Sequence, residues 1–294
     1  MSLPSNEPAA GATAPAAAAP DAFQAPRRGG WKFNRFLRAR VGVEQLRIDL
    51  LAGRRHPRQV ASVVMPYASG DGAERAAPTD LAQALAGFVP ALARLQEKLD
   101  GLGEGRVRGL SCDVIIDDSW MLYDVVHADL RGLAPGAADA LIAASLADVA
   151  GVEPTELSSR WQPQGASPYT LACGMPANAV PALREALATA GVVMGSVEGE
   201  FVAVYNRTRA QLDPQCAVLA LVRDAGTQMA VLVGGVLTSV SFEFGVGAAR
   251  ELELRGRGLL RSAGVSGAEN ARFYVLAPPE GSAPEPWVAL PLAA

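Results

Sequence analysis

Three residues in one short turn have the chemistry to hold a phosphate group. Asp224, Gly226 and Thr227 stand between two apolar runs, Cys216–Arg223 and 228–233, which we expect to form the strands of a hairpin. The backbone amides of such a turn, together with a threonine hydroxyl, can bind an anion. An ordinary hairpin turn also favours Asp and Gly, for their backbone geometry alone. The sequence leaves both alternatives open.

An earlier hairpin is expected from residues 41–51, returning through 60–67. Glu44 falls where a catalytic or metal-orienting acid would sit, but the residues that follow it include no glycine or hydroxyl to surround a phosphate. The chain also contains neither a P-loop nor a G-x-S-x-G motif. We therefore predict no catalytic residue and no obligatory cofactor. If ATP and Mg²⁺ bind, the expected contacts are Asp224, Gly226 and Thr227.

A cluster of four aspartates raises the question of a metal site. Asp113, Asp117, Asp118 and Asp124 have the oxygen ligands that Mg²⁺ prefers. On a pair of strands, however, the middle two form a polar turn and the outer two face solvent. The only two histidines are far apart in the sequence, so we predict no metal site.

The first 40 residues differ in composition from the rest of the chain. Residues 1–26 are rich in Ala and Pro and are expected to be disordered, because they offer little apolar surface to bury. Residues 27–40 interleave six bases with aromatic side chains. They form either an amphipathic helix that docks on acidic lipid or in a partner's groove, or a basic lead-in that packs on its own lobe. The residues predicted to contact a partner or membrane are Arg27, Arg28, Trp31, Lys32, Phe33, Arg35, Phe36 and Arg38.

Charge and hydropathy exclude several classes of protein. The net charge is −4, and because residues 1–26 carry two acids and 27–40 six bases, residues 41–294 carry eight net negative charges. Such an acidic body argues against general nucleic-acid binding. No apolar run approaches the ~18 residues that span a bilayer, and the three cysteines are widely spaced. We expect a cytoplasmic protein, with contact to the inner membrane through 27–40.

Strand-like and helix-like segments alternate along the chain, which predicts α/β layers built from two similar halves. Besides the two hairpins, strands are expected at 107–116, 120–126, 156–162, 169–175, 192–197, 236–244 and 271–276. Helices are expected at 78–99, 135–149, 178–190, 200–212 and 248–263.

Several of these segments resemble a known family. Residues 110–114 with 119–126 resemble a strand pair that the family writes as L-S-x-x-h-V-R-Y-x-L-x-P-W, where h is apolar, although Asp124 and Val126 depart from it. Residues 169–175, and then 191–197 with 200–206, resemble later segments of the family in the same order. The family is that of the actin-like (PilM-like) cytoplasmic proteins of type IV pilus and type II secretion assembly platforms.

The resemblance implies a two-lobed actin-like ATPase fold of the ribonuclease H-like α/β type. The body would span 41–294, with a first lobe of about 41–200 and a second of about 201–294. It also implies a non-catalytic adaptor that binds a cytoplasmic peptide of an inner-membrane pilus or secretion subunit. The alternatives are a nucleotide-binding actin-like ATPase or kinase-like enzyme, and an unrelated α/β module with a small ligand.

Overall fold

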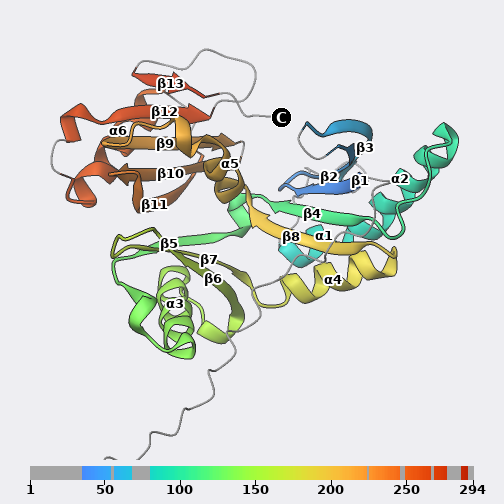
Figure 1. Ribbon diagram of the computed structural model, residues 1–294, viewed down its shortest axis with the longest axis horizontal. Helices are drawn as coiled ribbons and strands as arrows, with labels where there is room; N and C mark the ends of the chain where they lie inside the picture. Colours follow the sequence, from blue (N-terminus) through green and yellow to red (C-terminus); the bar gives the residue numbers. More distant parts are fainter. Residues whose placement is uncertain are drawn as a thin grey trace, which may run out of the picture. The chain divides into compact units, whose positions relative to one another are not determined.

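The computed structural model describes residues 35–53, 56–67, 80–223, 225–245, 249–265, 268–276 and 286–290, all within the unit Phe33–Ala294. Its first sheet has the order β3-β2-β1-β4-β8 (Figure 1). β1, β2 and β3 pair antiparallel in succession, whereas β4 pairs parallel with β1 and with β8. The strands are β1 (Arg35–Val41), β2 (Gln45–Ala52), β3 (Arg58–Pro66), β4 (Ser111–Ile116) and β8 (Val193–Gly199).

Side chains of β1 alternate between the two faces of this sheet. Leu37, Ala39 and Val41 are buried in a core shared with three helices, and Arg38 and Arg40 lie on the opposite face. The helices are α1 (Leu81–Ala86), α2 (Phe88–Leu102) and α4 (Ala179–Thr189). The single helix expected over 78–99 is thus divided, because α1 ends and α2 begins at Gly87.

The second sheet repeats the strand order and directions of the first. Its order is β11-β10-β9-β12-β13, with β9, β10 and β11 antiparallel and β12 parallel to β9 and β13. Helix α5 (Glu200–Thr208) packs on one set of β9 side chains and α6 (Ala249–Ser262) on the other, which explains the unbroken apolar run in β9. The strands are β9 (Cys216–Arg223), β10 (Gly226–Val233), β11 (Val236–Phe244), β12 (Arg272–Leu276) and β13 (Trp287–Ala289).

A third, antiparallel sheet lies between β4 and β8 in the sequence. Its order is β5-β7-β6, from β5 (Leu122–Val126), β6 (Leu157–Pro163) and β7 (Thr170–Pro176), and α3 (Pro135–Ala150) covers one face (Figure 1). Side chains from the other face join both large cores: Cys173 joins that of the first sheet and Leu171 that of the second. The small sheet therefore packs against both large sheets.

The predicted pairing of residues 107–116 with 120–126 is wrong. β4 lies between β1 and β8, so neither of its edges is open to β5, which pairs with β7 instead. The chain is redirected by a 3₁₀ turn over Asp118–Trp120, which Asp117 caps by accepting a hydrogen bond from the Ser119 N–H at 2.9 Å.

The first sheet begins earlier than expected. Residues 35–40 are strand rather than amphipathic helix, so β1 is an additional strand, and the hairpin expected over 41–51 and 60–67 corresponds to β2 and β3. Phe36 and Leu37 are both buried in the chain's own body. These two residues therefore follow the second alternative for this segment, packing on its own lobe. The predictions for residues 1–34 lie outside the described residues.

Most other predicted elements are confirmed within a few residues, including the hairpin of β9 and β10 and the helices α3, α4 and α6. The two halves share one strand order, as predicted. No helix in the described part of the chain is both long and apolar enough to cross a bilayer.

Candidate functional site

The β9–β10 turn does not present its glycine and threonine as a phosphate loop would. Asp224 lies outside the described residues. Gly226 is packed against β11, where an added Cβ would lie 2.6 Å from the Glu243 carbonyl oxygen, and Thr227 is completely buried. Nucleotide contact by these three residues therefore stays a prediction. Neither Gly226 nor Thr227 lines the pocket described below.

The first hairpin turn joins β1 and β2, and it contains a glycine that the sequence analysis placed inside the strand expected over 41–51. The Gly42 N–H donates to the Gln45 carbonyl at 3.0 Å and closes the turn. Glu44 is exposed, and its carbonyl accepts a hydrogen bond from the Tyr67 N–H at 3.0 Å. The predicted acidic position therefore faces solvent.

A pocket of about 250 Å³ lies where the ends of β1, β2, β4 and β9 approach the start of α5. Its lining is dominated by charged side chains from both large sheets. The lining residues are Arg40, Val41, Gly42, Gln45, Arg47, Ile115, Asp117, Glu200 and Arg223.

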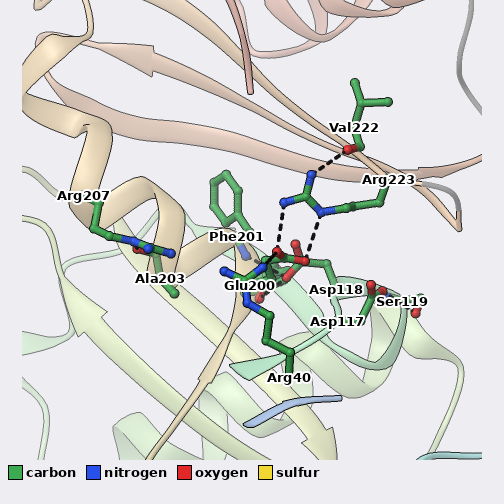
Figure 2. A network of polar contacts seen from close by, with 11 residues as sticks. Arg40, Asp117, Asp118, Ser119, Glu200, Phe201, Ala203, Arg207, Val222 and Arg223 are labelled. Carbon is green, nitrogen blue, oxygen red and sulfur yellow. Dashed lines mark hydrogen bonds and ion pairs between the residues drawn. The ribbon is translucent and has the colours of Figure 1, made fainter. Parts of the chain in front are cut away.

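Glu200, the first residue of α5, is bound by an arginine from each large sheet (Figure 2). Arg223 of β9 donates from Nε to Oε2 at 3.2 Å and from Nη2 to Oε1 at 2.9 Å, and Arg40 of β1 donates from Nη1 to Oε1 at 3.1 Å. Glu200 is only 6% exposed. Burial by itself raises the pKa of Glu200, but the hydrogen bonds and charge of Arg223, with the charges of Arg40 and Arg207, hold it below its ordinary value.

Arg40 and Arg223 lie close together because the two sheets have the same topology. Arg40 is the penultimate residue of β1 and Arg223 the last residue of β9, and these strands occupy equivalent central positions in the two sheets. Glu200 thus links equivalent strand ends through one buried carboxylate.

A second buried carboxylate positions the start of α5. Asp118 is 5% exposed, and its Oδ1 accepts hydrogen bonds from the Tyr123 hydroxyl at 2.6 Å and the Phe201 N–H at 3.0 Å. The pKa of Asp118 is raised to about 7, chiefly by burial and also by the nearby charges of Glu200 and Asp117, while the two hydrogen bonds act in the opposite direction. Asp118 was predicted to lie in a polar turn, and its burial was missed.

The four aspartates do not assemble into a metal site. Asp113 accepts hydrogen bonds from the Ser196 N–H and hydroxyl, and Asp124 accepts one from the Ser145 hydroxyl at 2.6 Å. Within the described residues, no group of three or more potential ligands could hold a metal ion.

The described residues of the predicted contact segment interact within the chain. Arg35 donates to the Glu104 carbonyl and forms an ion pair with its carboxylate. The Arg38 guanidinium lies 5.9 Å from the centre of the Phe36 ring. The other predicted contacts, Arg27, Arg28, Trp31, Lys32 and Phe33, are outside the described residues.

Gly199 provides a test of how tightly the Asp118 site is packed. An added Cβ would lie 1.8 Å from the Tyr123 hydroxyl oxygen, so Gly199→Ala is expected to displace Tyr123 and to destabilise the fold by about 1–3 kcal/mol in urea unfolding. The matched control is Gly136→Ala in α3, where the added Cβ meets nothing within 4 Å and should stabilise by about 0.5–1 kcal/mol. Equal effects of the two changes would contradict this packing.

No protein-family profile and no curated protein matches the chain. Solved structures do match. One is a protein of unknown function with an actin-like ATPase fold from Bacteroides thetaiotaomicron (TM-score 0.54, 7% identity, covering 84% of this chain and 83% of that one). Another is the cytoplasmic domain of EpsL, an inner-membrane component of the type II secretion system of Vibrio cholerae (TM-score 0.52, 14% identity, 88% and 90%).

A third match is the PilM–PilN type IV pilus biogenesis complex (TM-score 0.52, 14% identity, covering 82% of this chain and 80% of that one). These likenesses agree with the duplicated sheet order and confirm the predicted fold. The chain is a divergent protein of the actin-like ATPase fold, similar in structure to PilM and to the EpsL cytoplasmic domain.

Proposed function

We propose that this protein is a non-catalytic adaptor of a pilus or secretion-like assembly machine. It would act in the cytoplasm, at the inner membrane, by binding a cytoplasmic segment of a membrane subunit. Two of the structural neighbours support this role: EpsL is a component of a secretion system, and PilM is seen in complex with PilN.

The observation that carries the non-catalytic part is the Arg40–Glu200–Arg223 network. The pocket lies beside the turn that joins β1 to β2 and at the end of β9, and its arginines are the groups that an anion would contact. Here Arg40 and Arg223 already donate hydrogen bonds to the carboxylate of Glu200, which is fixed at the start of helix α5. A bound phosphate would have to lie beside this buried negative charge, which is unfavourable at short range.

The adaptor role predicts a membrane partner. Full-length protein captured from gently crosslinked native cells should enrich single-span inner-membrane subunits of a pilus or secretion-like machine, as identified by mass spectrometry. The matched control is capture under the same conditions from cells that lack the protein.

The alternative is a nucleotide-binding ATPase or kinase-like enzyme that uses Asp224, Gly226 and Thr227. It predicts that millimolar Mg·ATP raises the melting temperature, because a ligand that binds only the folded state stabilises it. Enrichment of no membrane subunit, together with such a rise, would replace the adaptor proposal with this one.

A further inference from the structure

The pocket at the strand ends is small. Its volume of about 250 Å³ lies below the roughly 300–1,000 Å³ of pockets that enclose drug-sized ligands. A side-chain carboxylate or a small oxyanion is of suitable size. The lining contains three arginines, Arg40, Arg47 and Arg223, and two carboxylates, Asp117 and Glu200, while Asp49 outside the lining pairs with Arg47 at 3.0 Å.

Two of these arginines face each other across a strand pair. Arg40 of β1 and Arg47 of β2 are direct partners in the antiparallel register. Side chains at such positions have Cβ atoms roughly 4.5–5.5 Å apart, and like charges there are destabilising. The next like-facing pair, Arg38 with Asp49, combines opposite charges. Each of the two already has one counter-ion, since Arg40 pairs with Glu200 at 3.1 Å and Arg47 with Asp49 at 3.0 Å. An anion between them would reduce their remaining repulsion.

Both arginines also retain unused hydrogen-bond donors. In Arg223 all three nitrogens are engaged, since Nη1 donates to the Val222 carbonyl at 2.9 Å and Nε and Nη2 donate to Glu200. Arg40 uses only Nη1, and Arg47 uses Nε for Asp49 and Nη2 for Gln59. Toward the residues that the structure describes, Nε and Nη2 of Arg40 and Nη1 of Arg47 make no hydrogen bond. A guanidinium group carries five N–H donors, so Arg40 and Arg47 can each donate a hydrogen bond to a further ligand oxygen.

We propose that this pocket binds one carboxylate, the Asp or Glu side chain of a partner segment, between Arg40 and Arg47. The inference rests on the proposed adaptor role and names the chemistry of the segment that the adaptor recognises. Guanidinium forks match the geometry of a carboxylate. A phosphate dianion would place two negative charges beside Glu200 and Asp117, so the monoanion fits better.

The test is a titration of full-length protein at constant ionic strength, followed by the backbone amide resonances of Gly42 and Gln45. The probe is the peptide Ac-Ala-Glu-Ala-NH2, and its neutral counterpart is Ac-Ala-Gln-Ala-NH2. Sodium phosphate and Mg·ATP form two further arms. Shifts that saturate with the glutamate peptide and are absent with the glutamine peptide are expected.

Arg47→Gln should weaken the binding of the glutamate peptide about tenfold or more, the value of a charge-assisted hydrogen bond. This variant leaves the Glu200 contacts intact, so it reports on the pocket even if Arg40→Gln disturbs folding. The control is Arg131→Gln, an exposed arginine paired with Asp129, which should leave the affinity unchanged.

Equal shifts with both peptides, or tighter binding of phosphate than of the glutamate peptide, would overturn the carboxylate assignment. If no probe shifted these resonances, the carboxylate assignment would also be overturned. The adaptor role would then still be tested separately by the capture experiment. Binding of Mg·ATP that is lost in Arg47→Gln would overturn both this inference and the non-catalytic role.

Discussion

Replacing Glu200 by glutamine is expected to lower the free energy of unfolding by about 2–4 kcal/mol. The substitution keeps the shape of the side chain but removes the charge that two guanidinium groups share. Arg223, with a side chain only 23% exposed, would keep its charge in a largely buried place without a counter-ion. The Arg40 side chain is 42% exposed, so water can solvate its charge and compensate part of the lost interaction with Glu200. Urea unfolding of full-length protein measures the difference.

The matched control is Glu253→Gln, which removes an exposed ion pair with Arg257 four residues along α6. Such pairs contribute about 0.5 kcal/mol or less. Within the network, Arg223→Gln should cost more than Arg40→Gln, since Arg223 makes two of the three bonds to Glu200 and is the more buried. If Glu200→Gln cost no more than Glu253→Gln, the carboxylate would not hold the two sheets together.

Local pattern was enough to predict most of the fold. The run over Cys216–Arg223 is apolar at every position because helices cover both of its faces, and a turn follows it directly, so the hairpin could be recognised. β1 was missed although Leu37, Ala39 and Val41 alternate with bases, a half-buried strand pattern. The many arginines in residues 27–40 suggested a surface segment, whereas Arg40 in fact donates a hydrogen bond to the buried Glu200.

The candidate site could not be predicted in the same way, because its contacts join distant parts of the chain. Glu200 lies 160 residues from Arg40 and 23 from Arg223, and the Phe201 N–H lies 83 residues from Asp118. No spacing rule connects such positions. Asp118 also follows Asp117 in a stretch typical of a polar turn, and only the packing of α5 on this stretch buries it. Tertiary structure decides which of two adjacent aspartates is buried.

Asp118 should make the stability of the protein fall as the pH rises from about 4 to about 7. Its folded-state pKa of about 7 lies above the ordinary value of 3.8, so over this interval the folded protein keeps a proton that the unfolded chain has released. Deprotonation therefore favours the unfolded state. A difference of about three pKa units corresponds to about 4 kcal/mol. Asp118→Asn has no such proton, and its amide oxygen can still accept from Tyr123 and Phe201.

The measurement is urea unfolding of wild type and Asp118→Asn at several pH values between 4 and 8. The other carboxylates titrate equally in both proteins, so the difference between them isolates Asp118. We expect the asparagine variant to gain about 3–4 kcal/mol relative to wild type across this range. Tyr123→Phe is the control: it removes one hydrogen bond to Asp118 but keeps the carboxyl, so its pH dependence should persist and extend to higher pH. A difference between wild type and Asp118→Asn that stays constant with pH would show that this carboxyl is already ionised in the folded protein across this range.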